Sequence, residues 1–116
     1  MPLTPDDFRR IALSLPETTE KAHMAHPDFR VRGKVFATLG YPDHGCGMVK
    51  LTREQQMHLV EDFPMMYSPF NGAWGARGCT YVQLKAATKT GVREAIKLAW
   101  RNTAPADLLR AEKGSK

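Results

Sequence analysis

The chain has 116 residues, of which 42% are hydrophobic, and this suits one globular domain with a single core. There is no run of about 18 apolar residues, and Met1–Thr4 lacks the basic-then-apolar pattern of a signal peptide. We therefore expect a cytoplasmic protein without a membrane span. The formal net charge of +5 favours polyanionic partners such as nucleic acid.

A helix is predicted near the start of the chain. Thr4 can cap it with its hydroxyl, and Pro5 suits the first turn. Two carboxylates, Asp6 and Asp7, lie at the positive end of the helix dipole. Apolar residues follow at the i, i+3, i+4 and i+7 spacing of one helix face: Phe8, Ile11, Ala12 and Leu15. Pro16 ends this helix, and we expect its apolar face to be buried.

A β-hairpin is predicted in the first half of the chain. Two β-rich runs, Asp28–Val31 and Lys34–Leu39, flank a tight turn at Arg32 and Gly33. Gly33 can adopt the positive φ that a two-residue hairpin turn requires. Counting outward from the turn places Phe29 opposite Phe36. Three cations lie at or beside the tip: Arg30, Arg32 and Lys34. We expect this basic hairpin to project from the domain.

Strands and a second helix are predicted around this hairpin. Lys21–Ala25 reads as a short strand before it, and Met48–Leu51 as a strand after it. Thr52 and Gln55 have the spacing of a capping box, which opens a helix that ends at about Asp62. The apolar side of this helix is expected to carry Met57, Leu59, Val60 and Phe63.

The last third of the chain begins with a glycine-rich segment, Asn71–Gly78, which we expect to be a loop or a bulged strand entry. Thr80–Leu84 alternates as a core-facing strand does. A long helix is predicted over Gly91–Thr103, and a short helical turn follows to Ala111. The long helix has an apolar face made of Val92, Ala95, Ile96, Ala99 and Trp100.

Four groups of residues occur in a recognisable order: Phe8 with Leu15-Pro16-Glu17, Phe29-Arg30-Val31 with Gly33-Lys34 and Phe36-Ala37, Val49-Lys50-Leu51, and Trp74 with Val82-Gln83-Leu84. This order resembles the MmcQ/YjbR family of small bacterial proteins, which are usually described as DNA-binding. The resemblance runs from about Phe8 to Pro105, nearly the whole chain. It implies a double-wing, frataxin-like arrangement of helices and strands, which is also seen in the DNA-binding domain of a phage transcription activator.

In a double-wing protein the hairpin would be the first wing, and the segment around Trp74 and Arg77 the second. The candidate nucleic-acid-binding residues are Arg30, Arg32, Lys34, Lys50, Arg77 and Lys85. Phosphate contact is assigned to Arg32, Lys34 and Arg77, and the other cations strengthen the positive field. A solvated hairpin would carry the same cations. Trp74 could stack on a base, but we expect it to be a packing anchor for the core.

A further row of cations falls four residues apart on the long helix: Lys89, Arg93, Lys97 and Arg101. This ridge would follow a phosphate backbone, or would simply form the solvated face of the helix. The sequence leaves open whether the ridge and the hairpin share one side of the molecule.

Metal binding and catalysis find no support in the sequence. The histidines and the two cysteines, Cys46 and Cys79, do not have the spacing of a known zinc site. Neither Ser14 nor Ser68 has the context of a nucleophile, and there is no P-loop or dinucleotide fingerprint. We expect reduced thiols, no metal, no cofactor and no enzymatic activity.

The sequence thus predicts one α+β domain over residues 1–116, with a core at about 4–104 and a frayed tail at 112–116. It has an N-terminal helix, a twisted antiparallel sheet with an inserted helix, and a C-terminal helix packed on the sheet. The hypothesised function is non-enzymatic binding of duplex DNA with little base readout, by a monomer. The alternative is a protein- or small-ligand-binding module that uses the exposed sheet face and the segment Met65–Tyr67.

Overall fold

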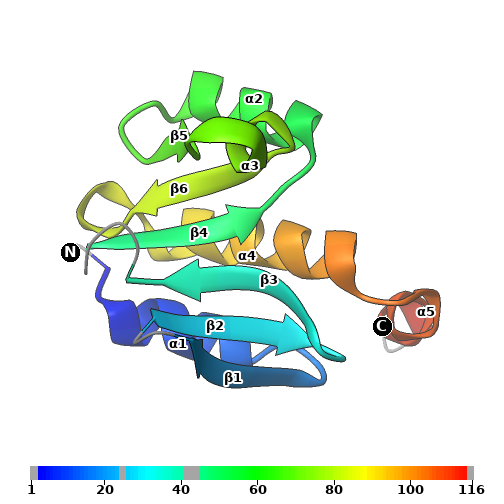
Figure 1. Ribbon diagram of the computed structural model, residues 1–116. Coiled ribbons are helices and arrows are strands. Elements are labelled where there is room, and N and C mark those ends of the chain that lie inside the picture. The colour runs from blue at the N-terminus through cyan, green and yellow to red at the C-terminus, as the bar shows by residue number, and fades with distance from the viewer. Residues whose placement is uncertain (1–2, 24–25, 41–44, 115–116) are drawn as a thin grey trace.

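The computed structural model describes residues 3–23, 26–40 and 45–114 (Figure 1). The elements in chain order are α1 (Pro5–Leu13), β1 (Thr18–His23), β2 (His26–Val31), β3 (Lys34–Leu39), β4 (Cys46–Lys50), α2 (Arg53–Asp62), β5 (Tyr67–Pro69), α3 (Gly72–Ala76), β6 (Cys79–Gln83), the 3-10 turn η1 (Leu84–Ala86), α4 (Lys89–Thr103) and α5 (Ala106–Gly114).

One six-stranded sheet organises these elements, in the order β1-β2-β3-β4-β6-β5. Every neighbouring pair of strands is antiparallel. Helices α1 and α4 cover one face of the sheet, α2 lies beside its β5 end, and α5 lies beyond the end of α4 (Figure 1). The predicted fold class is therefore confirmed: an α+β arrangement with an N-terminal helix, an inserted helix and C-terminal helices.

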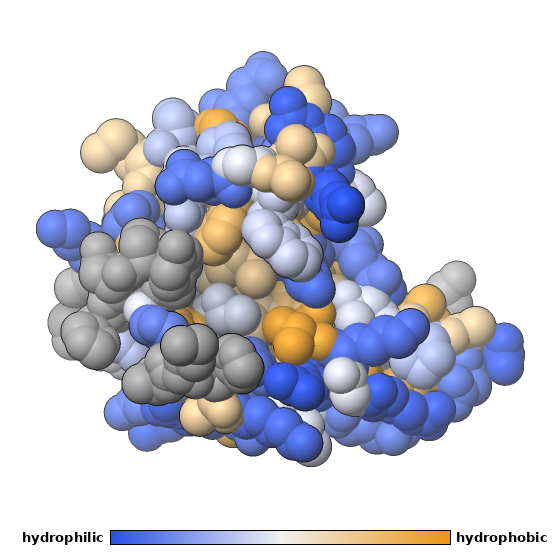
Figure 2. Space-filling view, viewed as in Figure 1, coloured by the Kyte–Doolittle hydropathy of each residue, from blue (hydrophilic) through white to orange (hydrophobic). Residues whose placement is uncertain are grey.

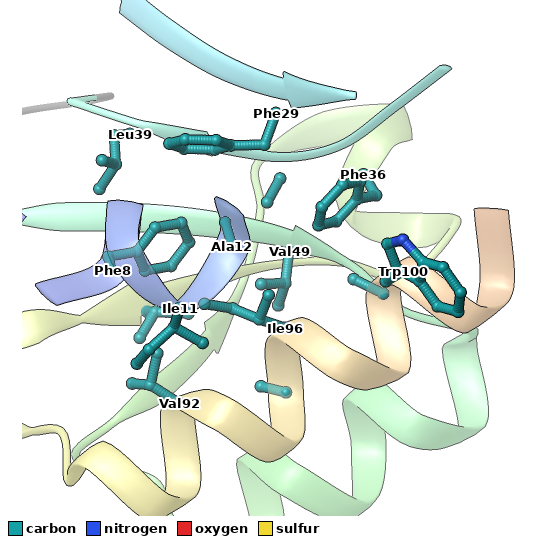
Figure 3. Close-up of a cluster of buried hydrophobic side chains, with 14 of the residues drawn as sticks. Phe8, Ile11, Ala12, Phe29, Phe36, Leu39, Val49, Val92, Ile96 and Trp100 are labelled. Atoms are coloured by element: carbon teal, nitrogen blue, oxygen red, sulfur yellow. The ribbon is translucent and has the colours of Figure 1, made fainter. Parts of the chain in front are cut away.

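The core lies between the sheet and the pair α1 and α4 (Figure 3). Thr4 caps α1 through a capping box with Asp7, as the local sequence predicts. The predicted apolar face of α4 is confirmed, because Val92, Ala95, Ile96, Ala99 and Trp100 are all buried. The indole Nε1 of Trp100 donates to the carbonyl of Pro16 at 3.0 Å, which ties α4 to the end of α1.

The turn between β2 and β3 is the predicted one, with φ of 50° at Arg32 and 84° at Gly33. The predicted pairing of Phe29 with Phe36 is wrong. Phe29 pairs with Ala37, because β3 carries one extra residue at this point, a β-bulge. The bulge lets two consecutive residues of β3, Phe36 and Ala37, both be buried.

The β2–β3 hairpin does not project from the domain as expected. Strand β1 pairs with β2 along its whole length, from Thr18 opposite Val31 to His23 opposite His26. The hairpin is thus an internal part of the sheet. Strand β1 begins three residues before the predicted start at Lys21, since β2 offers it a continuous partner.

Two other local expectations are also wrong, the second only in part. The segment Asn71–Gly78 forms the short helix α3 and not a loop or strand entry. The apolar side expected for α2 is only partly right: Leu59 and Val60 pack against the core, whereas Met57 and the C-cap residue Phe63 are largely exposed. The polar Gln56 is buried instead. Gln56 is buried because α2 packs against β5 and β6 at the end of the sheet, where the Gln56 amide donates to two backbone carbonyls.

The last helix, α5, extends to Gly114, beyond the predicted end at Ala111. Residues 115 and 116 of the expected frayed tail lie outside the described residues. Within the described ranges, no helix combines the length and the apolar character needed to cross a membrane.

Candidate functional site

The face of the sheet opposite α1 and α4 carries the candidate site. Side chains alternate between the two faces of a strand, so Val49 points into the core and its neighbours Met48 and Lys50 point to the other face. The register aligns further residues of this open face across the strands: Asp28 with Thr38, Arg30 with Val35, Met48 with Tyr81, and Lys50 with Cys79.

The open face is hollowed into a concavity of about 510 Å³. Figure 2 shows this hollow, hydrophobic in its centre and hydrophilic around it. Its lining residues are His26, Asp28, Arg30, Val35, Thr38, Met48, Lys50, Phe70, Trp74 and Cys79. A concavity with an apolar floor and a few charged groups at its edge is the common form of a ligand-binding site.

Trp74, on α3, is the exposed aromatic residue of this site. It is 54% exposed, which is unusual for a tryptophan in a small domain. The Nζ of Lys50 lies 5.8 Å from the centroid of its ring, and the guanidinium carbon of Arg77 lies 5.9 Å from it. The sequence favours a packing anchor over a stacking platform, but the exposure of the ring fits the stacking platform better.

Two features hold α3 and therefore Trp74 in place. Gly75 packs directly on the backbone of Phe70, since a Cβ at Gly75 would lie 1.6 Å from the Phe70 carbonyl oxygen. The buried amide of Gln56 donates to the carbonyls of Gly75 and Cys79, at 2.9 Å each. Its own oxygen accepts a bond from Arg53. The platform is thus fixed by backbone contacts and buried hydrogen bonds, although α3 itself is short.

An ion pair forms the opposite edge of the concavity. Arg30 donates to Asp28 through Nε at 2.9 Å and through Nη2 at 3.1 Å. This hydrogen bonding raises the pKa of Arg30 above its usual value. The side chain of Asp28 is only 8% exposed, so this carboxylate stays close to its partner.

A second, smaller hollow of about 300 Å³ continues the site on the other side of Trp74. Lys50, Trp74 and Cys79 line both hollows, and Arg77 and Asn102 line the second one. Asn102 donates to the carbonyl of Lys50 at 3.2 Å and to the side chain of Gln55 at 2.8 Å. The two hollows therefore form one continuous surface with Trp74 at its centre.

The thiol of Cys79 lies at the base of this surface. Burial raises its pKa, and the nearby charges of Lys50 and Arg77 only oppose that rise. A thiol with a raised pKa is a poor nucleophile at neutral pH. Cys46 and Cys79 are both buried and are not joined by a disulfide. Among the described residues, no three His, Cys, Asp or Glu side chains lie together in a way that would hold a metal ion.

Three of the six predicted binding residues meet at this surface: Arg30, Lys50 and Arg77. The other three lie elsewhere. Lys34 and Lys85 are exposed but line neither hollow. Arg32 is held by two carboxylates: it donates to Glu17 through Nε at 2.9 Å and Nη2 at 3.0 Å, and its Nη2 lies 2.9 Å from Asp107.

The N-terminal part of the cation ridge on the long helix lies on the other side of the molecule. Helix α4 packs on β3 and β4 from the face opposite the concavity. Lys89 and Arg93 of the ridge line a separate small hollow with Asp7 and Arg10 of α1. Lys89 and Arg93 therefore do not act on one ligand together with the Trp74 surface, whereas Arg101 directly precedes Asn102, which lines the second hollow.

The apolar floor of the site was missed by reasoning from the sequence. Val35, Met48 and Phe70 each read as ordinary strand or core residues. For Met48 the strand alternation was a signal: Met48 and Lys50 flank the buried Val49, so both side chains lie on the side of the sheet opposite the core. Phe70 gave no signal, because its position depends on β5 pairing with β6.

These features define a small α+β domain with one helix-covered face and one open face that combines an apolar hollow with cations. A model of the YjbR family matches residues 13–102, and the chain belongs to this family. No curated protein matches the sequence. The structure is similar to the crystal structure of Deinococcus radiodurans protein DR2400, described as a DUF419 domain, with a TM-score of 0.70 and 16% identity over 84% of this chain and 76% of that one. This similarity establishes a shared fold.

Proposed function

We propose that this YjbR-family protein is a non-enzymatic DNA-binding protein that uses the open face of its sheet. The observation that carries the proposal is the exposed Trp74 with Lys50 and Arg77 within 6 Å of its ring, beside an apolar hollow. Aromatic residues that stack on bases and cations that contact phosphates are the two components of sequence-tolerant nucleic-acid binding.

The charges of the site support a polyanionic ligand. No carboxylate among the described residues forms an ion pair with Lys50 or Arg77. Asp28 is the one described carboxylate that lines the hollow, and Arg30 neutralises it. Each phosphate that Lys50 or Arg77 neutralises releases a condensed counterion, which favours binding at low salt.

The open face offers a better contact surface than the β2–β3 turn. Both ion pairs of Arg32 would have to break before its guanidinium could turn to a phosphate, whereas Lys50 and Arg77 need only move away from Trp74. Lys34 remains available at the turn as a secondary contact. A reduced, cytoplasmic setting belongs to the same proposal, and two buried cysteines without a disulfide are in keeping with it.

The second candidate function is binding of a small apolar ligand in the same concavity. The floor formed by Val35, Met48 and Phe70 favours this alternative, because it is apolar and recessed. The salt dependence of binding distinguishes these two candidate functions. Polyanion binding weakens steeply as salt rises, whereas binding in an apolar hollow hardly responds.

The test is fluorescence anisotropy with labelled DNA at several salt concentrations. We expect binding at low salt, with the logarithm of the affinity falling linearly against the logarithm of the salt concentration. The double variant Lys50→Ala/Arg77→Ala should bind more weakly and show a slope smaller by about 2, since two phosphate contacts are lost.

The matched control is Arg93→Ala/Lys97→Ala, which removes the same charge from α4 on the opposite side of the molecule. It should change the affinity much less. If no form of DNA binds at low salt, the proposal is wrong. Equal losses in the two double variants would mean that net charge, and not this face, decides binding.

A further inference from the structure

We propose that the open face binds single-stranded DNA, with an unpaired base stacked on Trp74; this inference rests on the proposed function. The observations behind it are the depth of the apolar hollow, the exposure of the indole ring and the position of the cations around it. Each of them bears on whether the bound strand is paired or unpaired.

The apolar floor is the first argument. In a duplex the faces of the bases are stacked on one another, and only phosphates and base edges are presented to a protein. A duplex lying on the open face would leave Val35, Met48 and Phe70 uncovered in a hollow of about 510 Å³. An unpaired base is a flat, largely apolar group that can enter the hollow and cover this floor.

Trp74 is the second argument. It lies where the two hollows meet, so a base stacked on its ring has space for neighbouring nucleotides on both sides. Base–aromatic stacking is worth roughly 5- to 150-fold in affinity per base. A cation–π contact at an exposed site is worth only roughly 2- to 5-fold. A base can therefore displace Lys50 or Arg77 from the ring.

The charges complete the arrangement. Lys50 and Arg77 are long side chains anchored beside the ring, and when a base takes their place they can reach the phosphates that flank it. At the other edge of the hollow Arg30 is paired with Asp28, so this edge attracts a phosphate less than Lys50 and Arg77 do. The backbone of the strand is therefore expected on the side of Lys50 and Arg77, with the base directed into the hollow.

The experiment compares three ligands of about 15 nucleotides, a length near the upper end of the site size of one small single-strand-binding domain. They are oligothymidylate, the same strand annealed to its complement, and a strand of abasic nucleotides with the same phosphates. Tryptophan fluorescence reports stacking directly. Of the two tryptophans, Trp74 is 54% exposed and Trp100 is fully buried, so quenching by a bound base comes from Trp74.

We expect oligothymidylate to bind at least 10-fold more tightly than the duplex or the abasic strand, and to quench part of the tryptophan emission. Trp74→Ala should lose this quenching and reduce the affinity for oligothymidylate to near that for the abasic strand. Met57→Ala, which removes an exposed apolar side chain that lines neither hollow, is the matched control and should keep the preference. The comparison of oligothymidylate with the abasic strand uses the unmodified protein, so it tests the inference even if Trp74→Ala is unstable.

The failures are distinguishable. If the duplex or the abasic strand binds as tightly as oligothymidylate, the inference is overturned and the proposed DNA-binding function stands. If none of the three ligands binds at low salt, the proposed function itself is wrong. Binding of oligothymidylate without any change in tryptophan emission would also overturn the role given to Trp74.

Discussion

Replacing the buried Gln56 by methionine is expected to destabilise the fold and to loosen the Trp74 platform. Gln56 is only 1% exposed, and its amide donates to the carbonyls of Gly75 and Cys79. Methionine keeps the length of the side chain but cannot donate. It also loses the bond that the Gln56 oxygen accepts from Arg53, but Arg53 is exposed and water can replace that partner, so the two donated bonds decide the cost. At about 0.5–1.5 kcal/mol for each hydrogen bond lost, the free energy of unfolding should fall by about 1–3 kcal/mol.

The cost stays in this range because neither carbonyl is left without a partner. The Gly75 oxygen also accepts from the backbone N–H of Gly78 at 3.0 Å, and the Cys79 oxygen from that of Phe70 at 2.9 Å. Removing the amide therefore takes away one of two bonds at each oxygen. A larger loss would arise only if α3 itself came away from β6.

Urea denaturation monitored by circular dichroism measures this change. With a slope of about 2 kcal/mol per molar urea, the midpoint should fall by roughly 0.5–1.5 M. Met57→Ala, on the exposed side of the same helix, is the control and should stay within about 0.5 kcal/mol of the unmodified protein. A Gln56→Met variant as stable as the Met57→Ala control would refute the role assigned to the buried amide.

Three further predictions concern other parts of the chain. Burial raises the pKa of Tyr67 to about 12 from 10.0, so above pH 10 this tyrosine loses its proton in the unfolded chain before it does so in the folded one. The free energy of unfolding should therefore fall by about 1.4 kcal/mol per pH unit between pH 10 and about 12. In urea titrations, Tyr67→Phe should lack this part of the fall. Gly75→Ala forces a Cβ against the Phe70 carbonyl and should cost about 1–3 kcal/mol or prevent folding; a thermal unfolding curve unchanged from the parent would contradict the close contact. The hydrogen bond from Arg32 lowers the pKa of Glu17, so the pair stabilises the fold above pH 4.5, the ordinary Glu pKa, and this contribution is lost as the pH falls. Arg32→Ala should remove this acid dependence of stability, and its cost in stability should be smaller at high salt. The variant should leave the DNA affinity nearly unchanged.

The elements that the sequence predicts well are those decided by neighbouring residues. Thr4 and Thr52 begin α1 and α2 as expected, because a capping box involves only four consecutive residues. The turn at Arg32 and Gly33 and the apolar face of α4 are predictable for the same reason: turn geometry and helical spacing are local properties.

The features that escaped prediction depend on residues far apart in the chain. The ion pair of Arg32 with Asp107 joins residues 75 positions apart, so no local pattern shows that this cation is neutralised. Gln56 reads as a surface residue until α3 and β6 are placed beside it. The candidate site likewise depends on the order of strands in the sheet. This order places Lys50 of β4 beside Trp74 of α3, although the two residues are more than twenty positions apart in the sequence. The sequence identified the cations of the site but not the surface that unites them.

The two outer strands of the sheet bear on how copies of this protein behave at high concentration. An exposed outer strand can pair with another chain, which is the first step of β-aggregation. Here β5 has only three residues and ends at Pro69, which lacks the N–H that strand pairing needs. On the other side, β1 presents charged side chains, Glu20 and Lys21, to the solvent. Both outer strands thus disfavour the joining of sheets, so copies of this protein can be concentrated without forming fibrils by edge pairing.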